Sequence, residues 1–122
     1  MLARARVMVV DDDLSNRTAN DRLLRIAGYD SMAFASAEAL LDYQTSDCPG
    51  CVVTDLHLPA MSGLELIDAL CRRGEVPVIL ITAFDAPGLR QKALLRGAFA
   101  YLVKPFEGAA LLEAVDAALH HR

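Results

Sequence analysis

The 122-residue chain has few lysines and no excess of positive charge. Lysines account for only two of its twelve basic residues, Lys92 and Lys104, and sixteen acidic residues give a net charge of −4. Contact with a phosphate backbone needs a basic face, so this domain is not expected to bind nucleic acid directly. Hydrophobic residues make up 54% of the chain, which excludes a disordered segment and indicates one globular domain.

Long apolar runs are absent too. A membrane-spanning helix needs about 20 apolar residues in a row, and no run here comes close to that length. No secretory signal is expected either, because Asp11–Asp13 follow Arg4 and Arg6 before an apolar core can form. Cysteine is scarce, and its odd count of three indicates reduced thiols and a cytoplasmic protein.

Two of the cysteines, Cys48 and Cys51, form a C-x-x-C pattern. A redox pair of this type lies at a helix N-terminus after a strand, where the thiol pKa is lowered. Here Pro49 and Gly50 predict a turn, and Cys51 opens an apolar run. We therefore expect a loop cysteine and a buried strand cysteine rather than a redox or metal site.

Short apolar runs alternate with segments of helical periodicity along the chain. The runs predict strands over residues 6–10, 29–34, 51–54, 76–81 and 98–103. The other segments predict helices over 14–27, from Ser36 to Tyr43, from Ser62 onward, from Asp85 and Pro87 to Arg96, and over 107–121. Ser62 with Glu65 is a capping-box pattern. Alternation of this type implies an α/β fold, a parallel sheet with helices on both faces and right-handed crossovers.

Ligands of such sheets bind beyond the carboxyl ends of the strands. The polar residues found there are Asp11–Asp13, Asp55, Thr82 and Lys104. Asp13 is best interpreted as the cap of the first helix. The other acids repel one another and favour a hard divalent cation with oxygen ligands.

Such a site would be electrically balanced. Asp11, Asp12 and Asp55 carry three negative charges, which Mg²⁺ and Lys104 together neutralise. A neutral site can accept a dianionic phosphoryl group, and Thr82 offers a hydroxyl donor to one of its oxygens.

Four segments, in this order and spacing, resemble the motifs of response-regulator receiver domains: Val9-Val10-Asp11-Asp12, residues 53–63, Ile81-Thr82-Ala83 and Lys104-Pro105-Phe106. Ser36-Ala37-Glu38 resembles the FixJ-like branch, whose members usually carry a C-terminal helix-turn-helix. The resemblance covers the whole chain. It implies a flavodoxin-like (βα)5 doubly wound sheet of strand order 2-1-3-4-5.

The resemblance also implies a function in two-component signal transduction. Residues 1–122 would form a receiver domain, either complete or cut from a longer regulator with a C-terminal DNA-binding domain. It would accept a phosphoryl group from a histidine kinase or a histidine phosphotransfer protein. The domain would then switch conformation to control output, with transcription the expected output. It would catalyse only its own phosphorylation and dephosphorylation, so it is not expected to be an enzyme.

Residue roles follow from the same resemblance. Asp55 would be the phosphoacceptor. Asp12, Asp55 and the main-chain carbonyl of His57 would bind Mg²⁺, or Mn²⁺ in its place, and Asp11 would act through a metal-bound water. Thr82 and Lys104 would hold the phosphoryl oxygens.

Tyr101 occupies the family's aromatic switch position. Its ring is expected to turn inward when Thr82 moves toward the phosphoryl group. The Lys104–Pro105 peptide bond is expected to be cis.

His57 and Phe84 depart from the commonest receiver pattern. They stand two residues after the phosphoacceptor and two after Thr82, and we expect them to tune dephosphorylation. The alternative is that His57 is simply exposed and that Phe84 covers the mouth of the following helix.

A further expectation is a weak homodimer on phosphorylation, through the fourth helix, the fifth strand and the fifth helix. Arg90 and Arg96 could pair with Glu113 and Asp116 across a two-fold axis. Alternatively, these charges only solvate the two helices.

Two other functions compete with the receiver interpretation. In a haloacid-dehalogenase-like phosphatase Asp11 would be the nucleophile and Asp13 the acid/base. That family needs a further acidic pair after a later strand, and the pattern leaves Asp55 unexplained. In a phosphorylation-independent interaction module the site would have degenerated, yet nothing needed for phosphorylation is missing.

Overall fold

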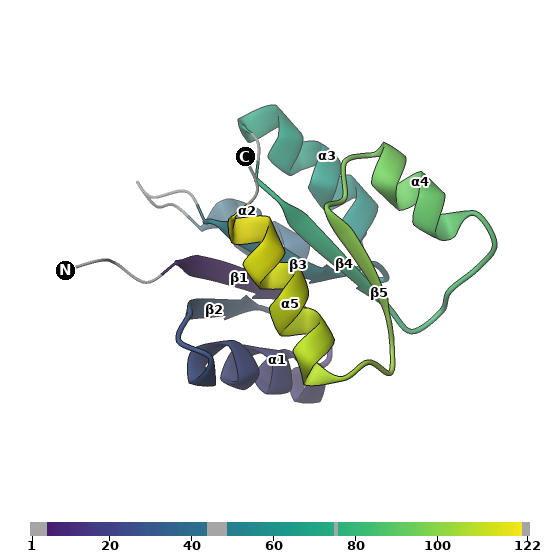
Figure 1. Cartoon of the computed structure of the whole chain (residues 1–122). Coiled ribbons are helices and arrows are strands. Elements are labelled where there is room, and N and C mark those ends of the chain that lie inside the picture. Colours follow the sequence, from purple (N-terminus) through teal and green to yellow (C-terminus); the bar gives the residue numbers. More distant parts are fainter. Residues whose placement is uncertain (1–4, 44–48, 75, 121–122) are drawn as a thin grey trace.

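The computed structural model describes residues 5–43, 49–74 and 76–120. Strands and helices alternate along the chain: β1 (Arg6–Val10), α1 (Leu14–Ile26), β2 (Asp30–Phe34), α2 (Ala37–Asp42), β3 (Cys51–Asp55), α3 (Gly63–Arg73), β4 (Val78–Thr82), α4 (Leu89–Leu95), β5 (Ala100–Val103) and α5 (Gly108–Leu119). The strands form one parallel sheet in the order β2-β1-β3-β4-β5, which confirms the predicted topology (Figure 1).

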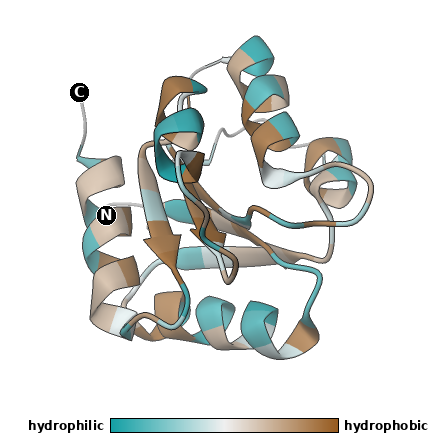
Figure 2. Cartoon of the chain, turned by 90° about the vertical axis from the view of Figure 1, so that its right-hand side faces the viewer, coloured by the Kyte–Doolittle hydropathy of each residue, from teal (hydrophilic) through white to brown (hydrophobic). Residues whose placement is uncertain are grey.

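Helices cover both faces of the sheet because side chains alternate between the faces along each strand. On one face Met8 and Val10 pack with apolar residues of α2, α3 and α4. On the other face Val7 and Val9 pack with residues of α1 and α5. All five residues of β4 are buried, as expected for a strand covered on both sides. Figure 2 shows mostly hydrophobic strands between helices in which hydrophilic and hydrophobic residues alternate.

The predicted helix caps are present. The Asp13 carboxylate accepts the amide of Asn16 at 2.9 Å, so Asp13 caps α1. Ser36 caps α2 in the same way. At the start of α3, Ser62 Oγ accepts the Glu65 amide at 3.2 Å, and Glu65 accepts the Ser62 amide at 2.9 Å. These local bonds explain why the sequence alone located the three helix starts.

The start of α4 was predicted too early. Asp85 and Pro87 were expected to open the helix, but it begins at Leu89. Pro87 and Gly88 instead occupy a turn in which the Leu89 amide donates to the Ala86 carbonyl at 3.1 Å. Gly88 has φ 81° and ψ −9°, the values of the third residue of a type II turn. Proline followed by glycine favours this turn over a first helical turn.

The strand cysteine is buried as predicted. Cys51 is fully buried in β3, and burial raises the pKa of its thiol to about 12. A thiol of this type is unreactive at neutral pH. Cys48 lies outside the described residues. Among the described residues, no helix has both the length and the apolar character needed to cross a membrane.

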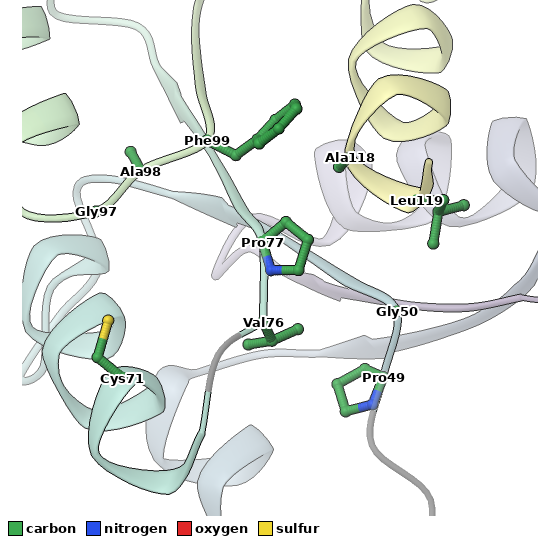
Figure 3. A pocket seen from close by; sticks show the side chains of 10 residues that line it. All are labelled: Pro49, Gly50, Cys71, Val76, Pro77, Gly97, Ala98, Phe99, Ala118 and Leu119. Carbon is green, nitrogen blue, oxygen red and sulfur yellow. The ribbon is translucent and has the colours of Figure 1, made fainter. Parts of the chain in front are cut away.

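A shallow pocket of about 750 Å³ lies at the end of the sheet where β3, β4 and β5 begin (Figure 3). Its lining includes Gly50, Val76, Phe99 and Leu119. The predicted site residues lie elsewhere, at or just after the carboxyl ends of the strands.

Candidate functional site

The carboxyl ends of four neighbouring strands bring the predicted polar residues together. The register of the parallel sheet accounts for this, because it aligns the last residues of adjacent strands: Val10 with Thr54, Asp55 with Ile81, and Thr82 with Val103. The residue that follows each aligned position then lies on the same rim. Asp11, Asp55, Thr82 and Lys104 are in this way placed beside one another.

Three carboxylates of this rim form a compact cluster. Asp11, Asp12 and Asp55 each offer an oxygen, and these oxygens all lie within 4.8 Å of one another. Asp11 is buried, Asp55 is half-buried and Asp12 is exposed. Lys104 Nζ lies 3.1 Å from Asp55 Oδ2 and 3.5 Å from Asp11 Oδ2. The Lys104 ammonium therefore contacts two of the three carboxylates in the cluster.

The electrostatics of the cluster favour an additional cation. Burial raises the pKa of Asp11, although the Asp13 amide and Lys104 act against the rise; the charge of Asp55 adds to it. Burial lowers the pKa of Lys104, but the hydrogen bond to Asp55 and the charge of Asp11 outweigh burial, and the net shift is upward. Lys104 thus stays charged at neutral pH and still leaves an excess of negative charge.

The cluster has the chemistry and size of a site for a small divalent cation. Mg²⁺ binds oxygen ligands at about 2.0–2.1 Å, so oxygens on opposite sides of it are about 4 Å apart. Oxygens already within 4.8 Å of one another need to move little to meet that spacing. Burial makes the Asp11 carboxyl group costly to ionise, so its charged form is strongly stabilised by a nearby cation.

The loop after β3 is tied closely to the end of that strand. The His57 amide donates to Asp55 Oδ1 at 3.0 Å, and the Gly63 amide donates to the Leu56 carbonyl at 2.9 Å. A Cβ at Gly63 would lie 2.6 Å from the Asp55 carbonyl oxygen, so only glycine allows this approach. Sequence analysis did not identify Gly63 as a site residue, because the contact is made only once the loop has folded back.

The same loop contains a strained residue and a brace from α2. Ala60 has φ 63°, in the left-handed region that residues with a side chain rarely adopt. The Met61 amide donates to Glu38 Oε2 at 3.1 Å, across 23 residues of sequence. Glu38 was expected from the sequence as an acid in the first turn of the helix after Ser36 and as part of a family motif; the structure adds its hydrogen bond to this loop.

Phe84 contacts both Thr82 and His57 beside the site. Thr82 is fully buried, and its Oγ1 accepts the Phe84 amide at 3.0 Å. Phe84 is 72% exposed, and its ring meets the ring of the exposed residue His57 edge-on, with centroids 5.7 Å apart. The two residues that depart from the family pattern are thus in contact with each other, and Phe84 reaches toward His57.

Tyr101 lies inside the domain. Its side chain belongs to the core on the α3 and α4 side, and the residue is only 3% exposed. Its hydroxyl donates to Asp85 Oδ1 at 2.7 Å. Burial, together with this hydrogen bond and the charge of Asp85, raises the pKa of Tyr101 to about 12. The ring was expected to turn inward on phosphorylation, but it is already inward in the unmodified chain.

The charges expected to pair across a dimer are partly engaged within the chain. Arg96 forms an ion pair with Asp68 of α3, with Nε 3.4 Å from Oδ1. Arg90 lies over the Tyr101 ring, 5.7 Å from its centroid. Arg96 is therefore already paired, and Arg90 is exposed but lies against Tyr101, which weakens the expected pairing with the acids of α5.

Arg17 is a site residue that sequence analysis missed. Its Nη1 donates to the Asp11 carbonyl oxygen at 2.9 Å, so a residue of α1 holds the main chain beside the acidic cluster. The sequence feature that could have identified Arg17 is its position one helical turn after the cap residue Asp13.

The Lys104–Pro105 peptide bond is cis, as predicted.

The geometry disfavours the phosphatase interpretation. Asp13, the acid/base of that interpretation, is exposed and caps α1. Asp55, which it left without a role, contacts Lys104 and lies close to Asp11 and Asp12. Among the described residues, no strand follows β5 to carry the additional acidic pair.

Comparison with known proteins agrees with this geometry. The family model for the response regulator receiver domain matches residues 7–116. Transcriptional regulatory protein TdiR of Thauera aromatica is 40% identical over 114 residues, 93% of this chain and 50% of that protein. Nodulation protein W of Bradyrhizobium diazoefficiens is 38% identical over 116 residues, 94% of this chain and 51% of that protein. The crystal structure of FixJ-N gives a TM-score of 0.88 at 32% identity, covering 99% of this chain and 98% of that one.

Proposed function

Because the chain belongs to the response regulator receiver domain family, we propose that it accepts a phosphoryl group on Asp55. The observation that carries the proposal is the position of the Asp55 carboxylate. It lies 3.1 Å from the Lys104 ammonium and beside the acidic pair Asp11 and Asp12. Family membership and the FixJ-like relatives agree with the resemblance predicted from the sequence.

The proposed donor is a phosphohistidine of a histidine kinase or of a histidine phosphotransfer protein. A carboxylate oxygen of Asp55 attacks the phosphorus, and a P–O bond forms while the P–N bond of the donor breaks. The electron pair of that bond returns to the imidazole ring, which takes up a proton. The product is an acyl phosphate on Asp55.

Asp12, Asp55 and the main-chain carbonyl of His57 would hold Mg²⁺, or Mn²⁺ in its place, and Asp11 would act through a water on the metal. When bound, the cation supplies positive charge to the phosphoryl oxygens during transfer. Lys104 would move its hydrogen bond from the Asp55 carboxylate to a phosphoryl oxygen while it keeps its contact with Asp11. The Lys104 ammonium would thus stay next to the negative charge that builds up on the phosphoryl oxygens during transfer.

Thr82 is suited to sense the phosphoryl group. A hydroxyl carries one proton and two lone pairs, and one lone pair of Thr82 Oγ1 already accepts the Phe84 amide. The proton remains available to a phosphoryl oxygen. A movement of Thr82 toward that oxygen would pull the β4–α4 loop along with it. Tyr101, on the neighbouring strand β5, would then be held in its inward position.

The chain spans about half the length of the two curated relatives compared above. Several of the relatives it matches are transcriptional regulators by name. We propose that residues 1–122 act as the receiver part of a cytoplasmic regulator whose C-terminal part binds DNA and controls transcription. The receiver itself would catalyse only its own phosphorylation and dephosphorylation.

The test is phosphorylation by a small phosphodonor. With acetyl phosphate and Mg²⁺, the mass of the wild-type chain should rise by one phosphoryl group, and a chelator should prevent the rise. Peptide mapping after borohydride reduction should locate the group on Asp55. Asp55→Asn should gain no stable phosphoryl group, because an amide is not a nucleophile. Modification of Asp11 in place of Asp55 would reject the proposal and support hydrolase chemistry.

A further inference from the structure

The β3–α3 loop, the segment of residues 56–62, is fixed at both ends to the rim of the sheet. The Leu56 amide donates to the Ile81 carbonyl of β4 at 2.8 Å, and the Gly63 amide donates to the Leu56 carbonyl at 2.9 Å. The loop contains His57, whose main-chain carbonyl is a ligand of the cation in the proposed function. The conformation of the loop therefore bears directly on the metal site.

One residue of this loop has a costly backbone conformation. Ala60 has φ 63°, and among the described residues it is the one non-glycine residue with a positive φ. Alanine reaches this region only at a cost that glycine does not have. Ala60 is also exposed, so packing of its own side chain does little to offset the cost. Such a conformation persists only where the contacts around it enforce it.

The carboxylate of Glu38 provides such a contact. The Met61 amide, directly after Ala60, donates to Glu38 Oε2 at 3.1 Å, and the Met61 side chain packs against the core on this face. Glu38 lies in the first turn of α2, a helix that Ser36 caps independently of the loop. A hydrogen bond to a charged acceptor is stronger than one between neutral groups. The main chain after Ala60 is thus held from a separate element.

Loss of this bond should let the loop relax. With Met61 released, Ala60 can rotate to the negative φ that alanine prefers, and this rotation redirects the chain on both sides of it. His57 lies only three residues before Ala60. A cation would then bind only the fraction of molecules in which the loop has returned, and its apparent affinity would fall by that fraction.

We propose that Glu38 is a positioning residue for the cation. By holding Met61 it keeps Ala60 in the left-handed conformation and keeps the β3–α3 loop in the arrangement that binds the metal. The effect on the cation rests on the proposed function, whereas the hold on the loop in the metal-free chain does not. The two are therefore measured separately.

The effect on the cation is measured by calorimetric titration with Mg²⁺, under conditions in which every variant is fully folded. Glu38→Ala should raise the dissociation constant for Mg²⁺ about tenfold, the effect usual for a residue that orients a metal ligand. Glu38→Gln keeps an acceptor oxygen without the charge and should give an intermediate value. Asp42→Ala removes an exposed acid from the same helix and should bind Mg²⁺ as wild type does.

A substitution at position 60 tests whether the effect passes through the strained residue. Glycine adopts a positive φ without cost, so Ala60→Gly should make the bond from Glu38 dispensable. The double variant Glu38→Ala/Ala60→Gly should recover most of the lost Mg²⁺ affinity. Ala27→Gly is the matched control, because Ala27 is exposed and has an ordinary φ of −74°. In the Glu38→Ala background it should restore nothing.

The hold on the loop is measured by amide hydrogen exchange in a chelator. In Glu38→Ala the amides of His57 and Gly63 should exchange about tenfold faster than in wild type, because their bonds to Asp55 and Leu56 open with the loop. The further change Ala60→Gly should slow both amides again, although the Met61 amide still lacks its partner.

The outcomes separate this proposal from the proposed function. An unchanged Mg²⁺ affinity in Glu38→Ala would overturn the positioning role, and so would a loss that Ala60→Gly does not correct or that Ala27→Gly corrects equally. A wild-type chain that binds no Mg²⁺ would reject the metal site of the proposed function. Amide exchange would then still decide whether Glu38 holds the loop, and unmoved rates in Glu38→Ala would show that it does not.

Discussion

Lys104 Nζ lies 3.1 Å from Asp55 Oδ2, although 49 residues separate the two and β4 runs between their strands. The same ammonium lies 3.5 Å from Asp11 Oδ2. One positive side chain is thus shared by two carboxylates, with Asp12 beside them. The cluster keeps an excess of negative charge.

Removing the buried charge of Asp11 should stabilise the metal-free chain at neutral pH. Burial and the charge of Asp55 raise the pKa of Asp11 above its ordinary value of 3.8. A carboxyl group whose pKa rises on folding favours the native state while it is protonated, and this contribution is lost as the pH rises through the folded pKa. Asp11→Asn cannot ionise, so its free energy of unfolding should exceed that of wild type at pH 7. The difference should shrink as the pH falls toward 3.8.

Urea unfolding in a chelator, at pH 7 and near pH 4, measures this effect. Asp13→Asn is the matched control, because it removes a neighbouring charge while asparagine still caps the helix. Its stability should change little. Saturating Mg²⁺ should stabilise wild type more than Asp11→Asn. A lower stability of Asp11→Asn at pH 7 in chelator would show that the bonds from the Asp13 amide and Lys104 outweigh burial.

Asp12 and Asp13 are adjacent in sequence but should behave differently. Asp12→Ala should weaken Mg²⁺ binding by tenfold or more, on the order of one lost direct ligand. Asp13→Ala should leave Mg²⁺ binding nearly intact, yet should lower the free energy of unfolding by about 1 kcal/mol through the loss of a helix cap. Isothermal titration with Mg²⁺ and urea unfolding of both variants separate the two roles. Equal losses of Mg²⁺ affinity would contradict the assignment of Asp12 as the ligand.

Gly63 should be intolerant of a side chain. A Cβ there would lie 2.6 Å from the Asp55 carbonyl oxygen and 2.9 Å from Leu56 Cα, and neither backbone atom can move without shifting the phosphoacceptor. Gly63→Ala should cost about 1–3 kcal/mol of stability, the usual cost of overpacking, and should slow phosphorylation by acetyl phosphate.

Gly108 provides the control for this substitution, because it also opens a helix. Its Cβ would meet only the Leu23 side chain, at 3.2 Å, and that side chain can adjust. Gly108→Ala should therefore cost less than Gly63→Ala and leave the phosphorylation rate unchanged. Similar losses in the two variants would mean that the Asp55 loop is more adaptable than its contacts indicate.

Phe84 should lengthen the lifetime of the phosphoryl group. Its ring contacts His57 at the mouth of the site and has no polar atom with which to orient an attacking water. Phe84→Asn and Phe84→Glu should shorten the lifetime several fold, as followed by the loss of phosphorylated mass after removal of the donor. Stability should change little, because the residue is 72% exposed.

Leu95→Asn is the matched control for Phe84. Leu95 is 81% exposed on α4, so the exchange removes a similar apolar surface away from the mouth. Its phosphoryl lifetime should equal that of wild type. A lifetime that stays the same or lengthens in both Phe84 variants would mean that the ring does not restrict the attacking water.

Much of the fold and the rim of the site could be predicted from the sequence because these features are local. The caps formed by Asp13 and by Ser62 with Glu65 are bonds between residues three apart. The alternation of buried strands and amphipathic helices also requires only neighbouring residues. Once a parallel sheet was inferred, the residue after each strand had to lie on one edge, which placed Asp55 and Lys104 together without coordinates.

Other features depended on contacts between segments far apart in the chain. The start of α4 was predicted too early because the same Pro87 that can open a helix is equally suited to a turn with Gly88. Hydrophobic periodicity in the sequence does not show how closely two segments approach each other. The need for glycine at position 63 is therefore visible only from its distance to the main chain of Asp55.

The sequence by itself determined which residues form the acidic rim, because each of them directly follows an apolar run that predicts a strand. Only the tertiary structure decided which side chains from other elements hold the loops around that rim. The hydroxyl of Tyr101 on β5 donates a hydrogen bond to Asp85, sixteen residues earlier in the loop before α4. Arg17 and Glu38 brace the loops beside the acids from two different helices. Bonds of this type depend on the relative placement of packed elements, which no local pattern in the chain encodes.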